Sequence, residues 1–339
     1  MRGLLDGSQE RNGAKVEQGT TDITADAVAL QERDEFRAQG WLKIVSPAKV
    51  NLHLAIGQRR ADGYHEAATI MHALNLHDVV YVRRKLPDDP DQSSPSVRMI
   101  SCGDVVAPDL PSCDNIAFKA VRRLSQRIGG ADEGIEIRIE KNIPAQGGLG
   151  GGSSNAAAAL LGAAQLWGLA PDDLAIEETA RELGSGVAFF LHGGCSYYEG
   201  TGEVFVHELV PSKRALALVK PDGGVSTGEA YRTFDSNPPT VPAAIAEAAR
   251  TARNACDVRL FNNLAPASET LMPELANVRE WLIEQPGVVD ALLCGSGATT
   301  FALCEDFGCA CQVVAAARKL GYWARTTSLG SLRAMLIST

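Results

Sequence analysis

The sequence predicts an α+β fold built in two halves, and three observations carry this prediction. An alternating strand at 135–139 leads into a glycine-rich loop at 147–152, and an alanine-rich helix follows the loop. Residues 215–327 show the order strand, helix, helix, strand, strand, helix, strand. With 339 residues, of which 45% are hydrophobic, the chain is also long enough to bury a large core in one or two domains.

The first half is expected to begin at Trp41 and to combine short strands with amphipathic helices. Ile116, Ala120 and Leu124 share one face of a helix, and Pro87 marks the start of a loop. Strands are expected where apolar residues cluster or alternate, at 42–45, 79–82, 97–100, 135–139 and 204–209. Helices are expected at 115–128, 154–167 and 172–183.

The second half is expected to begin near Ala215 and to contain a hairpin that turns at 295–297. Its strands are expected at 215–219, 288–294, 299–304 and 323–327. Its helices are expected at 243–253, 274–284 and 307–320. This order favours a ferredoxin-like half. We therefore predict an N-terminal extension at 1–40 and two domains, at 41–212 and 213–339.

The extension mixes acidic and basic residues and lacks the apolar core of a signal peptide. Within it, residues 25–36 can form a helix, and roughly the first twenty residues are expected to be disordered.

Composition argues against several classes of function. A net charge of −9 disfavours general nucleic-acid binding, which needs a basic face. No apolar run approaches the roughly twenty residues of a membrane span, so no membrane partner is expected. The eight cysteines are scattered without a C-x-x-C pair, which is typical of reduced thiols in a cytoplasmic protein. The oligomeric state stays open.

The segment 144–156 reads P-A-Q-G-G-L-G-G-G-S-S-N-A and predicts a nucleotide phosphate site. Glycines let backbone N–H groups approach a ligand closely, and a helix N-terminus adds free donors and a positive dipole end. The Walker A pattern fails because Ser153 follows Gly152 where a lysine is needed, and the pattern G-x-G-x-x-G fails because Asn155 stands at its last position. The hydroxyls of Ser153 and Ser154 suit a phosphate oxygen or Mg²⁺.

This segment resembles the second signature of the GHMP kinase superfamily, P-x-x-x-G-L-G-S/G-S-S/G. Its triple glycine followed by S-S-N-A-A is most similar to the 4-diphosphocytidyl-2-C-methyl-D-erythritol kinases of the non-mevalonate isoprenoid pathway. The resemblance covers roughly 41–339. It implies a ribosomal-protein-S5-like N-terminal domain, a ferredoxin-like C-terminal domain, and ATP with Mg²⁺ as cofactors.

Two further segments carry the resemblance, P-A-K-V-N-L at 47–52 and R-R-A-D-G-Y-H at 59–65. In that family the first segment holds a catalytic lysine, which matches Lys49, and a substrate-contacting asparagine, which matches Asn51. The second segment ends in D-G-Y-H, and its tyrosine and histidine match Tyr64 and His65. In the family the tyrosine stacks on the substrate's cytosine and the histidine binds its pyrimidine edge, so the resemblance implies these roles for Tyr64 and His65. A lysine on a strand supplies a point charge that can approach a phosphoryl group or a hydroxyl nucleophile.

The segment 225–231, with its V-S-T-x-x-x-aromatic pattern, implies Thr227 near the substrate and Tyr231 as a second face for the cytosine. The segment 293–301 resembles a third superfamily motif, a glycine loop that closes over the triphosphate. The ATP contacts that the resemblance implies are Asn115, Lys141, Pro144, Ala145, Gln146, Gly147, Gly148, Leu149, Gly150, Gly151, Gly152, Ser153 and Ser154.

One position departs from the family. The family's L-G-A/S-D-V/I-P/S-F-F holds a general-base aspartate, but 183–190 reads L-G-S-G-V-A-F-F, with Gly186 at that position. A positioned base contributes about 10²–10⁴-fold, while phosphoryl transfer depends mostly on positioning and electrostatics. The resemblance therefore implies a small-molecule kinase that phosphorylates the 2-hydroxyl of its cytidine diphosphate substrate, slowed by Gly186. Two alternatives remain, a GHMP kinase for another small alcohol and a catalytically silent nucleotide-binding paralogue.

Overall fold

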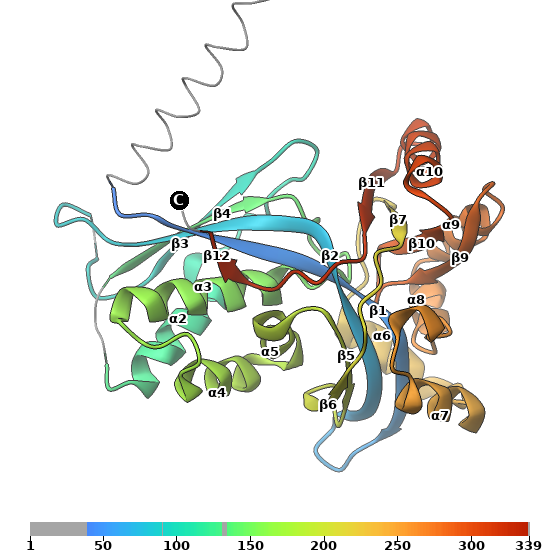
Figure 1. The fold of residues 1–339 in the computed structure, drawn as a ribbon, viewed down its shortest axis with the longest axis horizontal. Coiled ribbons are helices and arrows are strands. Elements are labelled where there is room, and N and C mark those ends of the chain that lie inside the picture. The colour runs from blue at the N-terminus through green and yellow to red at the C-terminus, as the bar shows by residue number, and fades with distance from the viewer. Residues whose placement is uncertain (1–38, 90, 131–133, 338–339) are drawn as a thin grey trace, which may run out of the picture. The chain divides into compact units, whose positions relative to one another are not determined.

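The computed structural model describes residues 39–89, 91–130 and 134–337. The chain divides into residues 1–41 and a unit that runs from Leu42 to Thr339 (Figure 1). The helix expected at 25–36 and the disorder expected before it lie outside the described residues. All the helices and strands described below belong to the second unit.

A mixed sheet forms the first half of this unit, because its strands carry alternating or continuous apolar residues. In β4, Ile135, Ile137 and Ile139 are buried while the residues between them are half-buried, the period of two expected of a strand. Five strands run in the order β12-β1-β2-β4-β3; in addition, β5 pairs with β2 and β6, and β8 pairs with β1. Their bounds are β1 Leu42–Arg59, β2 His65–Arg84, β3 Ser96–Ser101, β4 Ile135–Lys141, β5 Cys195–Glu199, β6 Val204–Glu208, β8 Phe261–Asn262 and β12 Met335–Leu336.

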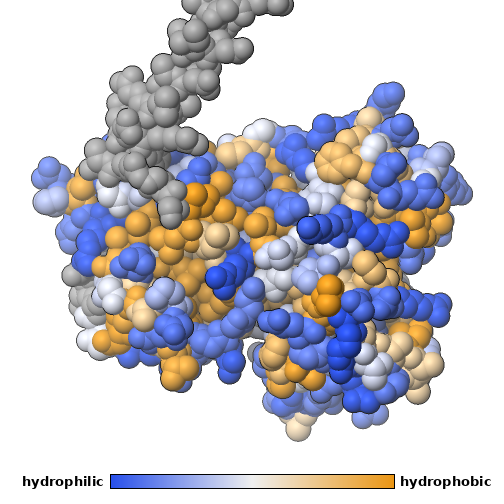
Figure 2. Space-filling view, in the orientation of Figure 1, coloured by the Kyte–Doolittle hydropathy of each residue, from blue (hydrophilic) through white to orange (hydrophobic). Residues whose placement is uncertain are grey.

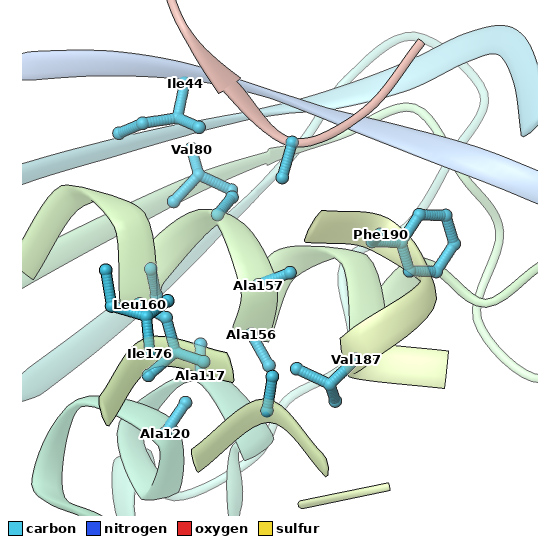
Figure 3. Packing of buried hydrophobic residues seen from close by; sticks show 14 of the residues in the cluster. Ile44, Val80, Ala117, Ala120, Ala156, Ala157, Leu160, Ile176, Val187 and Phe190 are labelled. Carbon is cyan, nitrogen blue, oxygen red and sulfur yellow. The ribbon is translucent and has the colours of Figure 1, made fainter. Parts of the chain in front are cut away.

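Helices cover one face of this sheet (Figure 1). They are η1 Ser112–Asp114, α2 Ile116–Arg127, α3 Gly151–Trp167, α4 Leu174–Leu183 and α5 Ser185–His192. The small side chains of α3 let it lie close to the sheet, and a Cβ atom on Gly162 would come within 2.7 Å of Val82 Cγ2. Figure 3 shows the resulting core, in which Leu160 of α3 lies beside Ile176 of α4, while Val80 of β2 lies near Ile44 of β1.

The second half contains a four-stranded antiparallel sheet in the order β11-β7-β10-β9. Numbered along this half, the order is fourth, first, third, second, which confirms the predicted ferredoxin-like arrangement. The strands are β7 Ala215–Lys220, β9 Val288–Leu293, β10 Thr300–Cys304 and β11 Trp323–Ser328. The helices are α6 Thr227–Ser236, α7 Ala243–Thr251, η2 Ala255–Asp257, α8 Ala265–Leu271, α9 Glu274–Ile283 and α10 Phe307–Lys319.

The structure differs from the sequence prediction in several elements. The helix expected at 154–167 begins at Gly151, because Gly150 takes a left-handed conformation with φ of 73° and the next glycines are already helical. Pro47 does not end the first strand, since a register shift between Pro47 and Lys49 lets β1 continue. The helix α5 was not predicted, because it is short and its buried residues run consecutively from Val187 to Phe190 without a helical period.

Two strands of the second half pair with the first sheet. β8 runs parallel to β1 at His53 and Leu54, and β12 runs antiparallel to β1 at Ile44 and Val45. The boundary between residues 212 and 213 stays a prediction. Figure 2 shows hydrophilic and hydrophobic residues interspersed over one face of the molecule. Among the described residues, no helix is both long and apolar enough to cross a membrane.

Candidate active site

A cavity of about 420 Å³ lies at the N-terminus of α3. Most of the ATP contacts implied by the sequence line this cavity: Asn115, Lys141, Pro144, Ala145, Gln146, Gly147, Gly148, Leu149, Gly150, Gly151, Gly152 and Ser153. A second, more open cavity of about 760 Å³ lies between His77 and Arg325, and none of the predicted site residues lines it. The chemistry of the glycine loop, rather than cavity size, therefore identifies the candidate site.

The glycine loop needs glycine because another loop packs tightly against it. Gly148 has φ of 73°, and a Cβ atom on it would lie 2.0 Å from the carbonyl oxygen of Cys294. The segment after Cys294 also bonds to the glycine loop, since Ala298 N donates to Gln146 O at 3.0 Å and Thr299 N donates to Gly147 O at 3.2 Å. The structure thus brings the two predicted glycine motifs, 144–154 and 293–301, into direct contact.

The first turn of α3 can bind an anion. No side chain caps this helix at Gly150, so the N–H groups of its first turn keep no capping partner from the described side chains. Such groups and the positive end of the helix dipole favour a phosphate. The Lys141 ammonium adds a positive charge, lying 3.3 Å from where a Cβ atom on Gly151 would be.

A buried polar network supports the loop from below, and its centre, Asp78, was not predicted from the sequence. The Asp78 carboxylate accepts hydrogen bonds from the Lys141 ammonium, from the backbone N–H groups of Asn142 (2.7 Å) and Ile143 (2.8 Å), and from Asn155 Nδ2 (2.9 Å). The available signal was a lone acidic residue directly before the apolar strand 79–82.

Ser154 belongs to this network and does not line the cavity. Its hydroxyl is fully buried and accepts a hydrogen bond from Ser46 Oγ at 2.9 Å. The hydroxyl that remains at the cavity is that of Ser153. Within the described ranges, no three His, Cys, Asp or Glu side chains form a group that could hold a metal ion. These residues fit Mg²⁺ only as an ion held mainly by phosphate oxygens, which is its usual mode beside a nucleotide.

Lys49 reaches the glycine loop from β1. Its Nζ atom donates to Asn51 Oδ1 at 2.6 Å and to the Gly148 carbonyl oxygen at 2.7 Å, and its backbone N–H donates to Leu149 O at 2.9 Å. Burial lowers the pKa of Lys49 to about 8, opposed by a smaller effect of the Cys294 thiol. Burial also raises the pKa of that thiol to about 12, so it is neutral near pH 7. Lys49, which was predicted to be catalytic, therefore lies beside the glycine loop, and burial destabilises its charged ammonium form.

Residues predicted to contact the substrate lie on β1, β2 and α6 and in the turn between β1 and β2. Asn51 Nδ2 donates to Thr69 Oγ1 at 2.8 Å, which fixes its amide toward Lys49. Thr227 Oγ1 lies 2.9 Å from Ser296 Oγ, which joins α6 to the second glycine motif. These bonds connect the substrate-side residues with both loops.

The aromatic residues predicted to hold a cytosine have different environments. Tyr64 lies in the turn between β1 and β2 with 67% of its surface exposed. His65 is buried against Tyr231, with ring centroids 5.1 Å apart, and its Nε2 atom lies 2.6 Å from Asp235 Oδ1. Asp235 was not predicted, since its place on α6 gives no sequence signal. The structure brings His65 and Tyr231 together, while Tyr64 presents a free ring face.

Gly186 lies in the first turn of α5 and faces the N-terminus of α3. A Cβ atom on Gly186 would lie 3.0 Å from Ser153 Oγ. One turn later, Phe190 contacts the same helix end, since its ring would lie 2.9 Å from a Cβ atom on Gly150. Lys49 Cγ would lie 3.0 Å from that same Cβ atom. Positions 186 and 49 therefore flank the start of α3 from different elements.

Comparisons with known proteins find similar sequences over most of the chain. Residues 115–194 match the family model for the GHMP kinases N terminal domain, and residues 241–322 match that for the GHMP kinases C terminal. A 4-diphosphocytidyl-2-C-methyl-D-erythritol kinase of Desulfitobacterium hafniense is 38% identical over 279 residues, covering 81% of this chain and 91% of that protein. One of Pelotomaculum thermopropionicum is 36% identical over 276 residues, covering 80% and 92%.

Solved structures are similar to this chain over most of its length. A crystal structure of a 4-(cytidine 5'-diphospho)-2C-methyl-D-erythritol kinase is similar at a TM-score of 0.64 and 31% identity, covering 85% of this chain and 100% of that one. A homoserine kinase from Cytophaga hutchinsonii, at 20% identity and a TM-score of 0.63, covers 88% and 97% and shares the fold.

Proposed function

Because this chain belongs to the 4-diphosphocytidyl-2-C-methyl-D-erythritol kinase family of the GHMP kinases, we propose that it transfers the γ-phosphoryl group of ATP to the 2-hydroxyl of that cytidine diphosphate substrate. The chain is an ATP-dependent small-molecule kinase of the isoprenoid precursor pathway. One observation carries the finer proposal: Lys49 Nζ bonds to the phosphate loop at Gly148 and to Asn51. The lysine therefore lies where phosphate and hydroxyl would meet.

ATP would bind in the cavity of about 420 Å³, with its phosphates at the first turn of α3 and its nucleoside toward Asn115. Asn115 also caps α2, accepting from Ala117 N at 2.9 Å, so the same amide that starts the helix faces the nucleotide. The Lys141 ammonium, which lines this cavity, is paired with the Asp78 carboxylate. Mg²⁺ would accompany the nucleotide, neutralising phosphate charge.

The cytidine end of the substrate would lie between Tyr64 and Tyr231. The exposed Tyr64 ring offers a face for stacking. The buried His65 ring forms a hydrogen bond between its Nε2 atom and the Asp235 carboxylate. The bond with Asp235 orders the ring and fixes which nitrogen carries the proton. Stacking on aromatic faces contributes about 1–3 kcal/mol per base. Asn51 and Thr227 would contact the part of the substrate nearer the transferred group.

Gly186 makes this enzyme slower than relatives that carry the aspartate. It has no side chain to accept a proton, and Ser153, which it faces, is a poor base at neutral pH. Gly186 is also the observation that favours a second candidate, a silent paralogue that binds nucleotide without turnover. Tyr64, His65 and Tyr231, which suit a cytosine, disfavour a third candidate, a kinase for another alcohol. The domains at 41–212 and 213–339 and a cytoplasmic location remain predictions.

Calorimetry with the cytidine substrate and a non-hydrolysable ATP analogue, together with a coupled ADP-release assay, tests the proposal. We expect binding of both ligands and measurable ADP release that depends on the substrate. Tight binding of both without turnover would favour the silent paralogue. Nucleotide binding without binding of the cytidine substrate would favour another alcohol.

A further inference from the structure

We propose that Lys49, as a free amine, is the base that accepts the proton of the attacking hydroxyl in this chain. The inference rests on the proposed function. It adds to that function the identity of the group that accepts the proton, since Gly186 provides no carboxylate to do so. It follows from the hydrogen-bond partners of Lys49, from its charge surroundings, and from the position of Gly186 across the start of α3.

The hydrogen bonds of Lys49 suit a neutral amine. A lysine ammonium has three N–H donors, whereas a neutral amine has two donors and one lone pair. Nζ has two acceptors, Asn51 Oδ1 at 2.6 Å and Gly148 O at 2.7 Å. Asn51 is itself held by Thr69, so its oxygen stays turned toward Lys49. With both donors of the amine used, the lone pair is left for an incoming hydroxyl.

No carboxylate among the described residues favours the charged form of Lys49. The elements packed around it present the amide of Asn51 from β1, the carbonyl oxygen of Gly148 from the glycine loop, the thiol of Cys294 from the end of β9, and the ring of Phe190 from α5. The thiol is the titratable group among these, and it stays neutral near pH 7 because burial raises its pKa to about 12.

Burial therefore decides the pKa of Lys49, which falls to about 8. At pH 7 about a tenth of such an amine is unprotonated, and at pH 9 about nine tenths is. An aspartate at position 186 would add a negative charge on the other side of the helix start and favour the ammonium. Gly186 therefore leaves no carboxylate base at its own position. Because it adds no negative charge, it also favours the unprotonated form of Lys49, which can accept the proton instead.

The transfer step balances with this assignment. The hydroxyl oxygen forms a bond to the γ-phosphorus, and the bond between that phosphorus and the oxygen bridging it to the β-phosphate breaks. The hydroxyl proton moves to Lys49 Nζ, and the bond electrons leave with ADP. The new ammonium then stands beside the transferred phosphoryl group and loses its proton to solvent after product release.

The first test is the pH dependence of turnover by the natural protein. We expect kcat/KM, which reports groups of the free enzyme, to rise tenfold per pH unit up to an apparent pKa near 8 and then level off. Bound triphosphate favours the ammonium, so the corresponding limb of kcat should lie at higher pH. In Gly186→Asp the apparent pKa of the kcat/KM profile should fall by more than one pH unit, since a carboxylate then accepts the proton.

The second test separates a base from a fixed positive charge. Lys49→Arg keeps the charge and cannot lose its proton, so it should lower kcat by at least about 10²-fold. Because a guanidinium differs in shape from an amine, Lys49→Ala is also assayed with added methylamine and ethylamine. The recovered rate should follow the concentration of free amine, not that of the ammonium ion. Carbon-13 NMR of labelled lysine should show one resonance, absent in Lys49→Ala, that titrates near pH 8.

The outcomes distinguish this inference from the proposed function. Substrate-dependent ADP release with a flat profile from pH 6 to 9, an active Lys49→Arg variant, or rescue that follows the ammonium ion would each overturn the inference and leave the kinase proposal standing. Absence of transfer at every pH, despite binding of both ligands, would overturn both.

Discussion

Gly186 and Ser153 face each other across the start of α3, with 3.0 Å between Ser153 Oγ and the point where a Cβ atom on Gly186 would lie. A side chain at position 186 therefore points at the phosphate end of the cavity, and Ser153, whose Cβ atom would lie 3.2 Å away, must shift slightly to admit it. This relationship makes position 186 a direct test of how much a carboxylate contributes here.

Gly186→Asp should raise kcat at pH 7 by between about 10-fold and the roughly 10⁴-fold limit for a positioned base. The lower limit follows from the small fraction of unprotonated Lys49 at that pH. Steady-state ADP release measures the effect. Gly186→Asn is the matched control, since it has the same size without a basic oxygen. A fast natural enzyme that the aspartate does not improve would contradict the argument.

Lys49→Ala should abolish phosphoryl transfer while leaving the affinity for an ATP analogue within about tenfold. The reason is that the Lys49 side chain contacts the loop at one carbonyl oxygen, Gly148 O, while the backbone amides of α3 remain in place. Single-turnover assays and calorimetry measure the two quantities. Lys43→Ala removes a lysine from the same strand, where it lies over the Tyr81 ring, and should keep full activity. Unchanged transfer by Lys49→Ala would refute the role of this residue.

Gly148→Ala should destabilise the fold by more than about 3 kcal/mol and weaken nucleotide binding. The added Cβ atom would lie 2.0 Å from Cys294 O at a φ of 73°, so one of the two loops must move. Urea unfolding and calorimetry measure both effects. Gly152→Ala is the control from the same loop, because its Cβ atom would meet nothing closer than Ile116 Cγ2 at 3.7 Å. That change should be neutral or stabilise α3 by up to about 1 kcal/mol.

Tyr64→Ala should weaken binding of the cytidine substrate by about 5- to 150-fold, as expected for the loss of one stacking face. The ring is 67% exposed, so the melting temperature should stay within about 1 °C. Tyr64→Phe keeps the ring face and should bind as the natural protein does. Equal affinity in the alanine variant would place the cytosine elsewhere.

Asp78→Ala should lower the free energy of unfolding by about 3–5 kcal/mol, because it leaves the Lys141 ammonium buried without its carboxylate. Nucleotide affinity should fall as well, since the network holds the base of the loop. Asp104→Ala breaks a partly exposed pair with Arg325 and should cost less than about 1 kcal/mol. Similar losses in the two variants would show that the buried network does not support the loop.

The sequence predicted the strands and helices in which apolar side chains recur at a regular spacing. It found 135–139 and 116–127 because buried and exposed positions alternate there at spacings of two and of three to four residues. It missed α5, whose buried residues follow one another without a helical period, and β8 and β12, which are two residues each and exist only because β1 offers a partner. Local pattern carries no information about such long-range pairing.

In the candidate site, too, some residues were predicted from sequence motifs and others became visible only in the folded chain. Motif spacing identified the glycine loop, Asn115 and Lys141, which line one cavity in the structure. It did not identify Asp78 or Asp235, because single aspartates are common and only the folded chain brings them to Lys141 and His65. Nor did it show that Ser154 is turned into the interior, since adjacent serines at a helix start look alike in a sequence.

The pairing of β12 with β1 has a consequence for how the protein is made. Ile44 leaves the ribosome early, yet its neighbour across the sheet, Leu336, is synthesised after all the intervening elements. Until then that edge of β1 exposes open backbone groups that can pair with another nascent chain. Slow translation of the segment that contains β12 would therefore lengthen the time during which this kinase is open to aggregation.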